Sequence, residues 1–123
     1  MGNNVLYIED NPDNMMLVQR ALEARGYHLL QAMNGLTGVN LAEREEVDLI
    51  LLDINLPDID GYEVARRLRA MKSNQRIKIV AVTGWGQEAD KQKSRAAGID
   101  VHLVKPVDAA ELRIALADNA TLH

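Results

Sequence analysis

Five side chains suited to metal or phosphate chemistry stand directly after apolar segments of the chain. Glu9 and Asp10 follow the first such segment, Asp53 the third, Thr83 the fourth and Lys105 the fifth. Carboxylates held close together repel one another unless a cation neutralises them, and carboxylate oxygens are ligands that Mg²⁺ prefers. The chain contains no cysteine, and no histidine stands at these positions, which argues against zinc. We therefore predict a site for magnesium, with manganese as the alternative.

A carboxylate can also attack phosphorus and form an acyl phosphate. Asp53 is the central candidate, because Glu9 and Asp10 can hold the cation beside it. Lys105 can then pair with one oxygen of the transferred group, and Thr83 can donate a hydrogen bond to another. Each of these residues alone also has an ordinary structural explanation, such as a helix cap or a solvated lysine. The joint occurrence of all five at four such ends favours the chemical interpretation.

The apolar segments themselves predict the elements that position these residues. Segments rich in Val, Ile and Leu predict strands over 5–8, 27–33, 47–52, 77–82 and 101–104. Several of them are nearly continuous rather than alternating, which is typical of parallel strands covered on both faces. Between the strands, apolar residues at spacings of three and four predict helices over 12–25, 35–45, 61–73, 87–97 and 108–119.

Residues that begin and end helices stand at the expected positions. Asn11 before a proline is typical of a helix start. Asp60 and Asp108 each precede a glutamate by three residues, which is the spacing of a capping box. Gly26 and Gly98 are predicted to end helices in the left-handed conformation.

Five strands alternating with five helices predict an α/β fold. Right-handed crossovers place the helices on both faces of one parallel sheet. In open sheets of this kind ligands bind at the carboxyl ends of the strands, which is where the five reactive residues stand. A length of 123 residues predicts one domain over residues 1–123.

Composition and charge argue against several other classes of protein. The first 60 residues carry 3 basic and 11 acidic side chains, whereas the remaining residues carry 11 and 7. We interpret the basic cluster from Arg66 to Lys78 as a solvated helix face. Aromatic residues make up only 3%, too few for base stacking, so no direct nucleic-acid binding is expected. No apolar run approaches the roughly 20 residues of a membrane helix, and we expect a cytoplasmic protein without membrane insertion.

Four motifs in order along the chain carry a resemblance to a known family. They are VLYIEDN from residue 5, DLILLDINLPDIDG from residue 48, VTG from residue 82 and VKP from residue 104. Over nearly its full length the chain resembles the receiver domain of two-component response regulators, of the chemotaxis-regulator type. The resemblance implies a flavodoxin-like (βα)5 sheet of order 2-1-3-4-5. The segment from Thr83 to Asp108 is similar to receivers attached to hybrid histidine kinases.

The resemblance also implies roles for particular residues. Asp53 would accept phosphate from a phosphohistidine on a sensor histidine kinase or a phosphotransfer protein. Asp10 and Asp53 would ligate Mg²⁺ directly together with the backbone carbonyl of Asn55, and Glu9 would act through a water. Pro106 would follow a cis peptide bond, which only X-Pro bonds adopt at low cost. Thr83 and Lys105 keep the roles given above.

Signalling in this family would remodel the face made by the fourth helix, the fifth strand and the fifth helix, and a downstream protein would bind this face. Phosphorylation-dependent dimerisation is a further possibility that the sequence leaves undecided. The usual switch residue is aromatic, whereas this chain has His102 there. His102 is either a switch, with an ordinary pKa of about 6.5 that makes signalling pH dependent, or a strand residue without that role. In this family the positions two residues after the acceptor and two residues after the threonine are associated with the lifetime of the acyl phosphate, and here they are Asn55 and Trp85. Trp85, which follows Gly84 beside the site, either shields the acyl phosphate from water or is an ordinary loop residue.

Two alternatives belong to other functional classes. A haloacid-dehalogenase-like phosphatase also uses Asp, Mg²⁺, Thr and Lys, but it places a second Asp two residues after the nucleophile, where this chain has Asn55. A degenerate receiver would act only as a binding module, but such domains typically lose the acceptor, an acidic residue or the lysine. We therefore expect a phosphorylation-controlled switch and not an enzyme that turns over a small-molecule substrate.

Overall fold

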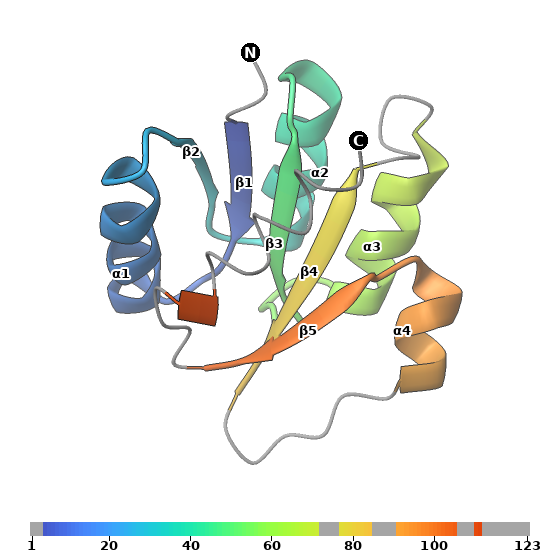
Figure 1. Cartoon of the computed structure of the whole chain (residues 1–123). Coiled ribbons are helices and arrows are strands. Elements are labelled where there is room, and N and C mark those ends of the chain that lie inside the picture. The colour runs from blue at the N-terminus through green and yellow to red at the C-terminus, as the bar shows by residue number, and fades with distance from the viewer. Residues whose placement is uncertain (1–3, 72–76, 85–90, 106–109, 112–123) are drawn as a thin grey trace.

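Residues 4–71, 77–84, 91–105 and 110–111 are described by the computed structural model, and their strands form one parallel sheet (Figure 1). The strands lie in the order β2-β1-β3-β4-β5, so the predicted fold class and strand order are confirmed. Their bounds are β1 (Asn4–Ile8), β2 (His28–Ala32), β3 (Leu49–Asp53), β4 (Lys78–Thr83) and β5 (Val101–Val104). The nearly continuous apolar segments became the central strands β3 and β4, which are buried along their whole length.

Four helices connect these strands: α1 (Pro12–Glu23), α2 (Gly35–Arg44), α3 (Gly61–Ala70) and α4 (Lys91–Ala97). Asn11 and Asp60 cap α1 and α3 through their side chains, as predicted, and Gly26 and Gly98 adopt positive φ after α1 and α4. The predicted fifth helix, over 108–119, lies mostly outside the described residues. Residues 110–111, the part of it that the structure describes, are helical. No helix within the described ranges is long and apolar enough to cross a membrane.

The helices divide between the two faces of the sheet (Figure 1). Helix α1 packs through Met15, Val18 and Leu22 against one face, and the other face contacts α2, α3 and α4. Alternation along β1 and β3 directs Val5, Tyr7, Leu49 and Leu51 toward the α1 face. Glu9 and Asp53 continue these two alternating rows at the carboxyl ends of the strands.

Helix α2 lies very close to the sheet at Gly38. A Cβ atom at this position would collide with the side chain of Ile8 in β1. Helix propensity alone predicts that Gly38 weakens α2 by about 1 kcal/mol relative to alanine. The close approach explains why a glycine nevertheless occupies the middle of this helix.

Candidate phosphoacceptor and metal site

Three carboxylates meet at the carboxyl ends of the adjacent strands β1 and β3. Ligand oxygens of Glu9, Asp10 and Asp53 all lie within 4.8 Å of one another. Glu9 is fully buried and Asp53 is 3% exposed, whereas Asp10 is exposed and opens the cluster to solvent. An all-oxygen donor set of this kind fits a hard cation such as Mg²⁺. The predicted convergence of these acids is therefore present.

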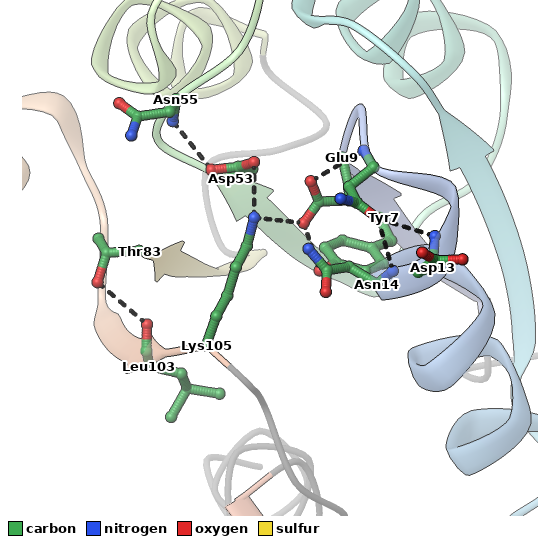
Figure 2. Close-up of polar contacts among 10 residues, drawn as sticks. Tyr7, Glu9, Asp13, Asn14, Asp53, Asn55, Thr83, Leu103 and Lys105 are labelled. Carbon is green, nitrogen blue, oxygen red and sulfur yellow. Dashed lines mark hydrogen bonds and ion pairs between the residues drawn. The ribbon is translucent and has the colours of Figure 1, made fainter. Parts of the chain in front are cut away.

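Lys105 joins two of these carboxylates from the far side of β4. Its Nζ lies 2.8 Å from Glu9 Oε1 and 3.0 Å from Asp53 Oδ2 (Figure 2). The backbone N–H of Lys105 donates to the carbonyl of Thr83 at 2.8 Å, which fixes the chain where β5 ends. The ammonium group thus supplies a positive charge between two buried acids.

Burial and mutual proximity give Glu9 and Asp53 different proton affinities. Burial and the neighbouring Glu9 carboxylate raise the pKa of Asp53 to about 6, against the opposing effect of Asn55 and Lys105. Burial also acts to raise the pKa of Glu9, but hydrogen bonds to Lys105, Asp53 and Asn11 outweigh it and lower that pKa. The pair therefore gives up its first proton readily and retains the second to higher pH.

Both carboxylate oxygens of Asp53 are hydrogen-bonded. The N–H of Asn55 donates to Oδ1 at 2.9 Å, and Lys105 donates to Oδ2. Asn55 itself is exposed directly beyond the end of β3. These contacts fix the orientation of the carboxylate, as a nucleophile requires.

Thr83 ends β4 at the same edge of the sheet, but its hydroxyl does not point at Asp53. Thr83 Oγ1 donates to the carbonyl of Leu103 in β5, with 3.5 Å between the oxygens (Figure 2). The predicted bond to a phosphoryl oxygen thus requires rotation of this side chain. Gly84 follows Thr83 and is partly buried. Trp85 and Pro106 lie outside the described residues, so the predictions made for them stay predictions.

The side chain of His102, in β5, contacts helix α4. Its ring Nε2 is 2.6 Å from the hydroxyl of Ser94, a buried residue of α4. In register it pairs with Ala81, and its neighbour Leu103 accepts the hydrogen bond of Thr83. His102 therefore connects β5 to α4 and takes no part in the carboxylate cluster.

The sequence analysis missed Tyr7, a residue of the site, and Asp58, in the loop after β3. The hydroxyl of Tyr7 donates to Glu9 Oε1 at 2.9 Å beneath the cluster. Burial and the Glu9 charge raise the pKa of Tyr7, so its hydroxyl stays protonated. The carboxylate of Asp58 accepts bonds from the N–H groups of Gly35 and Leu36, which ties the loop after β3 to the start of α2. The signal for Tyr7 was its position two residues before Glu9, since alternate strand residues share a face.

The fold and the site define a class of protein, the doubly wound α/β domains that have acids at the ends of the inner strands β1 and β3 and a lysine directly after the edge strand β5. The profile of the family described as "Response regulator receiver domain" matches residues 5–117. The chain belongs to this family and is a receiver domain of two-component systems.

Particular relatives agree with this membership. The polar-differentiation response regulator DivK of Brucella anthropi is 36% identical over 107 residues, which cover 87% of each chain. The receiver domain of the sensor histidine kinase PA1611 from Pseudomonas aeruginosa, solved with magnesium coordinated in its active-site cleft, is 35% identical. Its TM-score is 0.86, with 96% of this chain and 97% of that chain covered.

A third relative was solved together with a protein partner. It is the receiver domain of the Saccharomyces cerevisiae response regulator Ssk1, in complex with the histidine phosphotransfer protein Ypd1. It is 27% identical with a TM-score of 0.86, and the match covers 97% of this chain and 89% of that chain. Together these comparisons support the receiver interpretation over a haloacid-dehalogenase-like phosphatase.

Proposed function

We propose that Asp53 is the phosphoacceptor of a two-component or phosphorelay pathway. The donor is a phosphohistidine on a sensor histidine kinase or a phosphotransfer protein, a partner class supported by the complex of the related Ssk1 receiver with Ypd1. The observation that carries the proposal is the fixed Asp53 carboxylate, grouped with Glu9 and Asp10 and 3.0 Å from the Lys105 ammonium.

In the proposed reaction a carboxylate oxygen of Asp53 forms a bond to phosphorus while the phosphorus–nitrogen bond of the phosphohistidine breaks. The leaving imidazole keeps the electron pair of that bond and takes up a proton, so atoms and charge balance. Lys105 is placed to pair with a phosphoryl oxygen, because its Nζ already contacts the acceptor. Thr83 reaches a second oxygen after it leaves the Leu103 carbonyl.

Asp10, Asp53 and the backbone carbonyl of Asn55 would hold a magnesium ion, and Glu9 would act through a bound water. The cluster fits this ion because its donors are all oxygens. When bound, the ion offsets negative charge on the transferred group. Manganese has similar ligand preferences and is the alternative.

We further propose that the output is a change in protein contacts rather than turnover of a small-molecule substrate. An aspartyl phosphate carries nearly −2 charge where the ionised carboxylate carried −1, and the added negative charge draws Lys105 and Thr83 toward Asp53. Thr83 contacts β5 directly, and β5 contacts α4 through His102, so the described part of the predicted output face is connected to the site. A downstream protein would read this face. A cytoplasmic location is part of this proposal.

Phosphorylation with a small acyl-phosphate donor tests the proposal. Intact mass is expected to show one added phosphoryl group on the wild type with Mg²⁺, and peptide mapping should place it on Asp53. The Asp53→Asn variant should gain none, while Asp48→Asn, at the opposite end of β3, should be phosphorylated like the wild type. No phosphorylation of the wild type, or phosphorylation elsewhere, would contradict the proposal and favour a binding module.

His102 provides a separate prediction about the output. Replacing His102 with phenylalanine removes its hydrogen bond to Ser94, so α4 starts from a less constrained position. We expect smaller phosphorylation-linked changes in the amide chemical shifts of α4 and β5 than in the wild type, and a similar result for Ser94→Ala. Unaltered changes in both variants would show that His102 has no part in switching.

A further inference from the structure

Glu9 is held from three directions in the structure. Its Oε1 accepts from the Tyr7 hydroxyl at 2.9 Å and lies 2.8 Å from Lys105 Nζ, and its Oε2 accepts from the N–H of Asn11 at 3.2 Å. Glu9 is fully buried, so apart from the water proposed to join it to the metal ion it depends on donors that the fold holds in place. A buried carboxylate without donors carries a large free-energy penalty.

One of these donors serves two acceptors. Lys105 Nζ contacts Asp53 as well as Glu9, and its side chain is 20% exposed, so it has room to move. A phosphoryl group on Asp53 attracts the ammonium more strongly than a carboxylate does, because it carries more negative charge. Phosphorylation therefore takes Lys105 away from Glu9.

Tyr7 is not free to move in the same way. Its ring is 1% exposed in the middle of β1 and packs in the cluster beneath α1 that includes Met15, Val18 and Leu51. The hydroxyl is consequently fixed beneath Glu9 Oε1 whatever Lys105 does. Tyr7 lies two residues before Glu9 on the same face of β1, and a side chain there can donate a hydrogen bond to Glu9 only if it ends in a polar group.

We propose that Tyr7 is a positioning residue that holds the Glu9 carboxylate in place when Lys105 moves to the phosphoryl group. The assignment rests on the proposed function, since it presupposes phosphorylation of Asp53. It predicts that the Tyr7 hydroxyl favours the phosphorylated state in particular and is more than a contributor to packing. Phenylalanine keeps the ring and removes only the hydroxyl, so Tyr7→Phe isolates this effect.

Calorimetric titration with beryllofluoride and Mg²⁺ tests the inference, because beryllofluoride imitates a phosphoryl group on a carboxylate. Tyr7→Phe is expected to bind the probe about tenfold more weakly than the wild type, the fold-change of one hydrogen bond to a charged group. Tyr27→Phe is the matched control: Tyr27 packs against the same cluster, and its variant should bind like the wild type. In a Glu9→Gln background the further change Tyr7→Phe should alter affinity by less than about twofold, because the carboxylate is gone.

The outcomes separate this inference from the proposed function. If the wild type binds the probe and Tyr7→Phe binds it equally well, the role of Tyr7 is overturned and the proposed function stands. The same holds if Tyr7→Phe only lowers thermal stability, as a purely structural hydroxyl would. If the wild type binds no beryllofluoride in the presence of Mg²⁺, the proposed function is overturned and the role of Tyr7 with it.

Discussion

Asp53→Asn is expected to raise the free energy of unfolding of the Mg²⁺-free protein by about 2 kcal/mol at about pH 8. Burial and the Glu9 carboxylate raise the pKa of Asp53 to about 6, well above the ordinary 3.8. The folded chain therefore binds this proton more tightly than the unfolded chain does. Ionised Asp53 destabilises the fold, and asparagine removes that charge while it keeps the shape of the protonated acid.

The sign of the effect gives its pH dependence. An acid whose pKa is raised by folding contributes stability at low pH and loses it as pH rises from about 4 to about 6. The advantage of Asp53→Asn should thus be largest above about pH 7 and should vanish near pH 4. Urea denaturation of both proteins across this range measures it.

Asp13→Asn provides the control for this comparison. Asp13 is an exposed residue of α1 and is not one of the three clustered carboxylates, so its replacement removes the same formal charge from a solvated position. Equal changes in the two variants, or lower stability of Asp53→Asn at high pH, would contradict the electrostatic account. Saturating Mg²⁺ should reduce the advantage of Asp53→Asn, since the wild type has more carboxylates to bind the ion.

The positions of the reactive residues could be predicted from the sequence because two simple rules apply to them. Near-continuous apolar segments identify buried parallel strands, and parallel strands bring their carboxyl ends to one edge. These rules place Glu9, Asp53 and Lys105 together without any knowledge of side-chain contacts. Strand bounds were less accurate: Asp53 and Thr83 are the last residues of β3 and β4 rather than the first residues after them.

Contacts that depend on side-chain orientation across several strands could not be predicted. Thr83 bonds to the carbonyl of Leu103 because β4 and β5 are adjacent there, a fact that residue type does not reveal. The contact of His102 with Ser94 likewise depends on how α4 packs on the sheet. Gly38 is unfavourable by helix propensity, and the proximity of Ile8 explains why it is present.

The close carboxylates of the site have two opposing electrostatic effects, attraction of a cation and repulsion of one another. Close carboxylates create the affinity for a cation, but they also destabilise the fold when no cation is present. Lys105 offsets part of that repulsion while it stays close enough to Asp53 to contact a phosphoryl group. The lysine should therefore matter for stability as well as for signalling.

Lys105→Met is expected to lower the free energy of unfolding by about 3 kcal/mol at about pH 8 without Mg²⁺, the opposite sign to Asp53→Asn. Removal of one partner from a buried ion pair leaves an uncompensated charge. Here both Glu9 and Asp53 lose their ion pair with the Lys105 ammonium. Methionine retains most of the apolar stem, so packing changes little. Stability should recover below about pH 6, where the two acids together retain a proton, and in saturating Mg²⁺, which replaces the missing positive charge.

A double-mutant cycle with Glu9→Gln distinguishes this mechanism from a loss of packing. If carboxylate repulsion causes the loss, Glu9→Gln should restore much of the stability of Lys105→Met, because it removes one of the two charges. In the wild-type background Glu9→Gln should destabilise the fold, because it removes the ion pair between Glu9 and Lys105. Urea denaturation of the four proteins at about pH 8 measures the coupling, which should exceed about 1 kcal/mol. Additive effects of the two substitutions would mean that Lys105 stabilises the fold through its stem, and that the ammonium between the acids is needed only for the phosphoryl group.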